Sequence, residues 1–232
     1  MFRTVMLGAM ALVAPAAMAA DAAQDVTDAA KKLGDAANYS WKTTSENAGG
    51  GGFNATIEGA AEKDGYTSLK MTFGDNNIEV AVKGGKGALK TEDGWKSSEE
   101  AANDENGPGR FLAAIVQNFK APAAQAQDIV SKTKDLKQAD DAYTAELTEE
   151  GAKQLATFRR GNNANGPQIS NAKGTIKFWV KDGTLAKMEY HIQATMTVNG
   201  EDRDIDRTTT TEIKDVGSTK VEVPDDAKKK LP

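Results

Sequence analysis

Apolar and polar residues alternate with a period of two along two long stretches of this chain. In the first stretch, residues 39–91, short alternating segments are separated by Gly-rich and Asp-Gly turn signals. Such alternation is typical of strands that bury one face and expose the other to water. We therefore expect an antiparallel meander of short strands there, after which Asp93-Gly94 turns the chain toward Trp95.

The second stretch contains the most regular alternation in the chain. Residues 176–181 alternate, and Asp182-Gly183 then predicts a hairpin turn. Residues 186–198 alternate strictly over thirteen positions, with Ala186 expected on the apolar face. Asn199-Gly200 predicts a second hairpin turn, from which we expect a return strand to about Lys214.

Helical spacing replaces this alternation in the remaining segments. The expected helices are Asp25–Leu33, Arg110–Phe119, Ala123–Lys134 and Glu149–Phe158, the last with Thr148 as its N-cap. We also expect a strand over Ala142–Leu147, a loop or frayed helix over Ser97–Asn106, a mobile loop over Arg159–Gln168, a last strand over Thr219–Val223 and a charged tail over Asp225–Pro232. This order predicts an α+β fold: one large, strongly curved antiparallel sheet with helices against its apolar face.

The first twenty residues predict export from the cell. Arg3 supplies a positive start, Val5–Val13 is a short apolar run, and Ala17-Met18-Ala19 has the small-x-small form of a signal-peptidase site. The apolar run is shorter than the roughly 20 residues needed to cross a bilayer. We expect residues 1–20 to be a cleaved signal peptide, cut near Ala19 or Ala20, and residues 21–232 to form one domain with a helical insert at about 99–160.

Charge and cysteine content narrow the functional classes further. The net charge is −5 and no basic stripe is present, which disfavours nucleic acid and anionic membrane surfaces as partners. The chain contains no cysteine, which excludes disulfides, lipid attachment through cysteine, thiol nucleophiles and Cys-based zinc sites. An exported chain without disulfides favours a bacterial periplasm, so we expect a soluble periplasmic product with no stable membrane insertion.

No catalytic motif is legible in the sequence. A Gly-x-Ser-x-Gly elbow, a P-loop and a His-Glu-x-x-His segment are all absent. His191 is the only histidine; it falls on the polar face of its strand, where we expect it to face solvent, with no acid placed by spacing to orient it. Glu201, Asp202, Asp204 and Asp206 alternate along a presumed strand, which indicates a solvated face and not a calcium loop. We therefore expect no enzyme activity, no metal and no cofactor.

The order of elements resembles the bacterial outer-membrane lipoprotein carrier family (LolA-like) and the related lipid-binding lipoproteins of mycobacteria. The resemblance rests on the N-terminal helix that leads into the Tyr39-Ser40-Trp41 strand, the meander and the central helical insert. It also rests on the Phe178-Trp179-Val180 hairpin with Asp182-Gly183, the Met188-Glu189 strand, and the closing Val216-Gly217 and Val221-Glu222-Val223-Pro224. It implies an unclosed half-barrel whose helices act as a lid on a hydrophobic cavity for acyl chains. Unlike the mycobacterial relatives, this chain lacks a lipidation cysteine.

The apolar face of the sheet, with the helix beside it, is the main candidate site. Its residues are Trp41, Phe53, Ile57, Leu69, Met71, Phe73, Ile78, Val80, Phe111, Ile115, Phe119, Met188, Tyr190, Ile192 and Met196. Methionine suits a surface that repacks around varied chains. The residues alone favour an ordinary core packed against Phe111, Ile115, Phe119 and Phe158, whereas the resemblance favours a ligand cavity, so both interpretations stay open.

Two further expectations concern function. Arg207 falls on the inward side of the return strand, where it could meet a ligand head group, but a wet, charged edge strand is the favoured interpretation. The sequence as a whole predicts a binding protein that carries or senses a lipid, an acyl chain or a lipidated protein, gated by the Arg110–Phe119 helix. The alternative is an interaction module for another envelope protein, on the same fold without a cavity.

Overall fold

The computed structural model describes residues 15–48, 54–103, 109–157 and 168–232. The described strands are β1 (Asn38–Asn47), β2 (Ala55–Glu62), β3 (Thr67–Phe73), β4 (Asn76–Lys83), β5 (Lys86–Thr91), β6 (Gly94–Ser97), β7 (Thr133–Ala139), β8 (Ala142–Leu147), β9 (Gln168–Lys181), β10 (Thr184–Val198) and β11 (Glu201–Lys214). The described helices are α1 (Pro15–Asp35), α2 (Ser98–Ala102), α3 (Gly109–Gln117), α4 (Pro122–Val130), α5 (Glu149–Ala156) and α6 (Asp225–Lys228).

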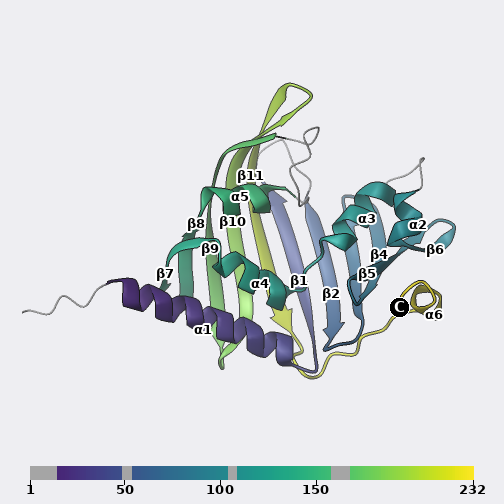
Figure 1. Cartoon of the computed structure of the whole chain (residues 1–232), viewed down its shortest axis with the longest axis horizontal. Helices are drawn as coiled ribbons and strands as arrows, with labels where there is room; N and C mark the ends of the chain where they lie inside the picture. Colours follow the sequence, from purple (N-terminus) through teal and green to yellow (C-terminus); the bar gives the residue numbers. More distant parts are fainter. Residues whose placement is uncertain (1–14, 49–53, 104–108, 158–167) are drawn as a thin grey trace, which may run out of the picture.

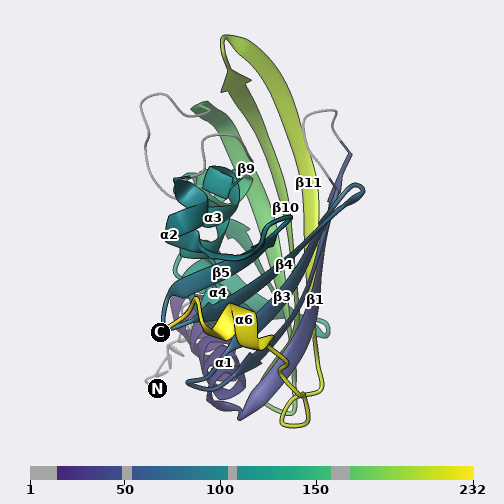
Figure 2. The same cartoon turned by 90° about the vertical axis from the view of Figure 1, so that its right-hand side faces the viewer.

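All eleven described strands form one antiparallel sheet in the order β6-β5-β4-β3-β2-β1-β11-β10-β9-β8-β7. The sheet is strongly curved and does not close, because its two end strands, β6 and β7, pair with no strand beyond them (Figures 1 and 2). Helices α1 to α5 lie along its concave side (Figure 1). The predicted α+β class and the single curved, unclosed sheet are therefore confirmed.

The two long hairpins form where the turn residues predict them. Asp182 and Gly183 have φ of 51° and 69°, and Asn199 and Gly200 have φ of 53° and 84°. Positive φ at both central residues is the requirement of a type I′ turn, whose twist matches that of the flanking strands. One detail of β10 differs from the prediction: a register shift between Leu185 and Lys187 buries Leu185 in place of Ala186.

Two helix predictions need correction. One placed the start of α1 too late, and the other extended α4 over the start of strand β7. The first helix begins at Pro15, upstream of the predicted Asp25, although the predicted apolar stripe from Val26 to Leu33 is buried as expected. The helix predicted to run to Lys134 ends at Val130, because the chain turns there into β7. That strand carries a single buried apolar residue, Leu136, and so has no visible alternation.

The remaining short elements follow their local signals. Thr148 caps α5 by accepting a hydrogen bond from the Gly151 amide at 3.0 Å, as predicted. Within the predicted loop or frayed helix, Ser97 and Glu100 form a reciprocal capping box that starts α2. Phe158 and residues 159–167 of the predicted mobile loop lie outside the described residues, as does most of the predicted signal peptide.

The C-terminal segment contradicts the predicted last strand and solvated tail. Residues 219–224 form no strand, and Asp225–Lys228 form the short helix α6. Val223 and Ala227 are buried against Ala81, whose side chain faces away from the helices because Val80 beside it packs into the main core. The segment therefore covers part of the convex face, and its end reaches α2, where Lys230 forms an ion pair with Glu100 at 2.9 Å.

The rest of the convex face carries a row of alternating charges across seven neighbouring strands. In register order these residues are Lys90, Glu79, Lys70, Glu58, Lys42, Glu212 and Lys187. The Lys90–Glu79 and Lys42–Glu58 distances are 2.7 and 3.4 Å, and Lys187 lies 4.4 Å from the centre of the Trp179 ring. Opposite charges on neighbouring strands favour this register, since a one-residue slip would turn each of them to the other face.

Gly59 lets a large aromatic side chain lie flat over the sheet. It is the register partner of Trp41, and a Cβ added at Gly59 would lie 2.2 Å from Trp41 Cζ2. Because both residues face the concave side, only glycine leaves room there for the indole ring. The Gly59–Trp41 pair thus fixes the ring at the centre of the concave face.

We expect Gly59→Ala to destabilise the protein by about 1–3 kcal/mol, because the added methyl group forces the Trp41 ring to shift. Urea unfolding followed by circular dichroism measures the loss. Gly34→Ala is the matched control, since its Cβ would meet Ala123 at an ordinary 3.4 Å. Equal stabilities for wild type and Gly59→Ala would show that the ring is not held by this contact.

Candidate functional site

The structure brings thirteen of the fifteen predicted site residues into one hydrophobic cluster. Seven of them are buried: Trp41, Leu69, Met71, Val80, Met188, Tyr190 and Ile192. Six are partly buried and pack against the same cluster: Ile57, Phe73, Ile78, Ile115, Phe119 and Met196. Phe53 lies outside the described residues, and the Phe111 side chain is likewise not described.

The helices on this concave face form two groups. Helices α1, α4 and α5 make their main contacts over β7 to β10, and α2 and α3 make theirs over β5 and β6 (Figure 1). The central strands β11, β1, β2 and β3 lie between these two groups. The chain between α3 and α4, residues 118–121, passes from one helical group to the other.

A stacked pair of aromatic rings closes the centre of the face. The Phe119 ring, on the 118–121 linker, lies 6.2 Å from the Trp41 ring at an interplanar angle of 18°. Tyr39 packs beside Trp41 at 5.6 Å, and burial raises the pKa of the Tyr39 hydroxyl to about 12. Tyr39 and Trp41 are 5% and 4% exposed, so this part of the concave face is closed to solvent. The Phe119 ring is only partly buried, so it forms the outer layer of the stack.

The stripe of α3 that faces the sheet differs in part from the predicted one. Of the predicted stripe Phe111, Ile115, Val116 and Phe119, Val116 is buried as expected, whereas Ile115 and Phe119 are only partly buried. Leu112 and Ala113 are buried beside Val116. Val116 packs so closely on β5 that a Cβ at Gly87 would lie 1.9 Å from its Cγ1. Sequence reasoning missed Leu112 because a stripe through Phe111, Ile115 and Phe119 gave an equally good helical spacing.

A polar strip interrupts the apolar concave face along β1 and β11. It consists of Thr43, Ser45, Arg207, Thr209 and Thr211, of which all but the partly buried Thr43 are buried. The Thr43 and Thr211 hydroxyls lie 2.8 Å apart, and those of Ser45 and Thr209 lie 3.0 Å apart. These cross-strand hydroxyl pairs satisfy polar groups that would otherwise be costly to bury.

The favoured sequence interpretation of Arg207 is wrong. Strand β11 is not an edge, because it pairs with β1 on one side and β10 on the other. Arg207 is 6% exposed, and its Nη2 donates a hydrogen bond to the Leu155 carbonyl in the last turn of α5. Burial lowers the pKa of the Arg207 guanidinium. At neutral pH the group still carries its charge, so the concave side holds a buried cation.

His191 also departs from its prediction. It does lie on the convex face, with a side chain 40% exposed, but an acid orients it: His191 Nε2 is 2.6 Å from Asp206 Oδ1. Asp206 Oδ2 also accepts a hydrogen bond from Gln193 Nε2 at 3.0 Å. The β10–β11 register brings these residues together, and the predicted Asn199-Gly200 turn already implied that register. The bonds from His191 and Gln193 lower the pKa of the Asp206 carboxyl.

The lowered pKa of Asp206 implies that its contribution to the free energy of unfolding is lost in acid. Because its pKa is lower in the folded protein, the stabilisation is complete above the ordinary value of 3.8 and disappears as the pH falls through the lowered value. We expect Asp206→Asn to be less stable than wild type at about pH 7 and nearly equal to it well below about pH 3. Urea midpoints at both pH values measure this, and a difference that persisted unchanged in acid would contradict the assignment.

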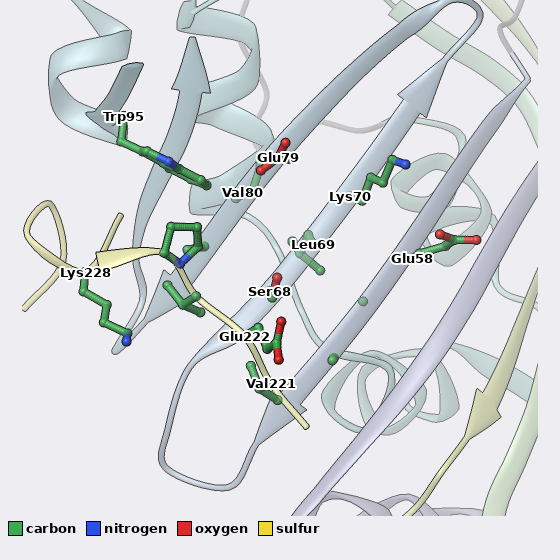
Figure 3. Close-up of a pocket in the computed structure, with 15 residues that line it drawn as sticks. Glu58, Ser68, Leu69, Lys70, Glu79, Val80, Trp95, Val221, Glu222 and Lys228 are labelled. Atoms are coloured by element: carbon green, nitrogen blue, oxygen red, sulfur yellow. The ribbon is translucent and has the colours of Figure 1, made fainter. Parts of the chain in front are cut away.

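A groove of about 820 Å³ lies on the convex side, between β2–β4 and the C-terminal segment. Figure 3 shows Trp95 and Lys228 near one end and Val221 and Glu222 along the C-terminal segment. Its charged groups are largely engaged, since Glu58 pairs with Lys42 and Glu79 with Lys90. The described residues contain no group of three or more side chains placed to hold a metal ion, and no described helix is long and apolar enough to cross a membrane.

Comparison with known proteins gives only distant likenesses. No protein-family model matches the chain, and no curated protein matches it. Among solved structures, LprF from Mycobacterium bovis is 11% identical, with a TM-score of 0.48 over 90% of this chain and 98% of that one. The Pseudomonas aeruginosa MucA/MucB complex is 12% identical, with a TM-score of 0.31 over 88% of this chain and all of the matched chain. A DUF1329 family protein from Desulfovibrio piger is 9% identical, with a TM-score of 0.32 over 88% and 95% of the two chains. Likenesses this distant assign neither a function nor a ligand to the chain.

Proposed function

We propose that the protein is an exported, non-enzymatic binding protein of the bacterial periplasm. Residues 1–20 are its cleaved signal peptide, and residues 21–232 shelter a lipid, an acyl chain or the acyl chains of a lipidated protein on the concave face. The observation that carries the proposal is the division of the helices into two groups, joined by a linker that stacks Phe119 on Trp41 at the centre of the face.

Several features of the concave face suit an acyl ligand. Met71, Met188 and Met196 contribute unbranched side chains that repack easily around a flexible chain. Each CH₂ group transferred from water to such a surface is stabilised by about 0.8 kcal/mol. In the structure these side chains belong to one hydrophobic cluster with apolar residues of the helices. Binding therefore requires a helical group to move, and we assign that movement to α3 and the linker that carries Phe119.

We infer that the linker of residues 118–121 acts as a hinge between α3 and α4. Helix α3 ends with the Asn118 Nδ2 donating to the Ala114 carbonyl at 2.7 Å, and α4 starts at Pro122 with no side-chain cap on its N-terminus. The few residues between these ends hold Phe119 over Trp41. A rotation of this linker lifts the ring from the centre of the sheet without breaking either helix.

A matched pair of variants on β2 tests the proposal. Ile57 faces the concave side and is partly buried, whereas its neighbour Thr56 faces the convex side. Such a position is better suited to the test than Met188 or Ile192, whose full burial makes a charged replacement incompatible with folding. The assay is co-elution of the mature protein with a triacylated lipopeptide and with a C16 fatty acid in size-exclusion chromatography.

We expect wild type and Thr56→Asp to bind at least one of these two ligands, and folded Ile57→Asp to bind about tenfold more weakly or not at all. Failure of the wild type to bind either ligand would contradict the proposal. The interaction of an envelope protein with the convex face would then be the better account.

A further inference from the structure

The polar strip on the concave face has a feature that core packing alone does not explain. A sheet face built only for packing would carry apolar residues at these positions, since burying a guanidinium costs free energy even when it is well bonded. Yet Arg207, Thr209 and Thr211 are 6%, 3% and 1% exposed on the same face as Tyr190 and Ile192. These three polar residues stand at alternate positions of one central strand.

The concave side of β1 becomes more polar from Trp41 toward Asn47. Following the concave side of β1, the chain passes from Trp41 to Thr43, Ser45 and Asn47, and Asn47 is the register partner of Arg207. Six residues of strand span roughly 20 Å. The apolar end of this path lies under Phe119, and the cationic end lies beside the C-terminus of α5. The path therefore has the polarity of an amphiphile laid along the strand.

The chemistry of the strip selects the kind of head group. Arginine binds carboxylate and phosphate oxygens through parallel N–H donors, and it keeps its positive charge at neutral pH. Each hydroxyl is both a donor and an acceptor, and each Thr/Ser pair uses only one of its two O–H hydrogens internally. The strip thus presents a cation and adjacent hydroxyls next to an apolar surface, which is the complement of an anionic head group on an acyl chain.

We propose that the polar strip around Arg207 is a head-group subsite, and that the ligand of this protein is an anionic amphiphile bearing a carboxylate or phosphate. This inference rests on the proposed function and adds the ligand class to it. The acyl chain lies toward Trp41, where the linker movement proposed above makes room for it, and the anionic group contacts the Thr209 hydroxyl and Arg207 in place of the Leu155 carbonyl.

The test compares ligands that share an acyl chain and differ in charge. A fluorescent C16 fatty acid is compared with its methyl ester, and phosphatidylglycerol with phosphatidylcholine of the same chains. We expect wild type to bind the anionic member of at least one pair at least about tenfold more tightly than the other member. A tenfold ratio of affinities corresponds to about 1.4 kcal/mol of binding free energy. The pair that shows the preference identifies carboxylate or phosphate as the head group.

Arg207→Gln is expected to reduce this preference to near one while leaving the affinity for the uncharged or zwitterionic ligand unchanged. Arg203→Gln is the matched control, because it removes an exposed arginine four residues away on the same strand. The wild-type ratio decides the question even if Arg207→Gln does not fold. Equal affinities for both members of each pair would overturn the head-group subsite but leave the proposed function standing, whereas absence of all binding would overturn both.

Discussion

Replacing Met188 by Asp is expected to abolish folding. The side chain is fully buried in the first half of β10, where it packs between the sheet and the helices of the concave side. A carboxylate there would lose its hydration, and Arg207, the buried cation among the described residues, stands opposite Ile192, four residues along the strand. The cost would be several kcal/mol. The whole free energy of unfolding of a domain is about 5–15 kcal/mol, so most of it would be lost.

Circular dichroism and urea unfolding of the purified variants measure this effect. Met188→Leu is the conservative control, because it keeps the volume and the apolar character and should cost less than about 1.5 kcal/mol. A Met188→Asp protein that unfolded at nearly the wild-type urea concentration would show that this face is open to water, against the burial described above.

Removing the Phe119 ring is expected to have the largest effect on ligand uptake. In the proposed mechanism the ring must leave Trp41 before an acyl chain can reach the centre of the sheet. Phe119→Ala removes that step, so we expect uptake of a fluorescent C16 fatty acid to become about tenfold faster, equivalent to about 1.4 kcal/mol of the barrier. Stability should fall by about 1–3 kcal/mol, less than for a fully buried phenylalanine.

Stopped-flow fluorescence measures the uptake rate. Phe73→Ala is the control, because Phe73 is also partly buried against the core but lies at the end of β3, away from the Trp41 stack. Both variants lose a ring and some stability, and only Phe119→Ala should accelerate uptake. Equal rates for the two variants would place the gate elsewhere on the concave face.

Local patterns predicted those elements whose stability depends on local signals. Strict alternation and Asp-Gly or Asn-Gly turns located β10 and both long hairpins, and Ala142–Leu147 was found with its observed bounds. Strand β7 was missed because an edge strand buries only Leu136 and so has no apolar period. The sequence predicted a charged tail at the C-terminus because the composition of this segment is polar. Its contact with Ala81 depends instead on where the chain crosses the sheet.

In the candidate site, too, local patterns predicted some features, whereas others depend on contacts between distant segments. Periodicity correctly placed Trp41, Met188 and Ile192 on one buried face. It could not show that β11 pairs with β1, a contact between residues far apart in sequence that turns a presumed edge into the centre of the sheet. The burial of Arg207 depends on that long-range pairing, so spacing did not predict it. The bond from His191 to Asp206 depends instead on the register of the Asn199-Gly200 hairpin, which the turn itself sets.

Native mass spectrometry of the protein purified from a bacterial periplasm tests the central claim most directly. The account predicts a mature chain that begins near Asp21 and carries a discrete additional mass, released by solvent extraction as an acyl-chain lipid or lipidated peptide. Folded Ile57→Asp from the same preparation should lack that mass, and Thr56→Asp should retain it. A wild-type protein that is recovered without added mass, and remains so when fatty acids and lipopeptides are supplied, would contradict the account.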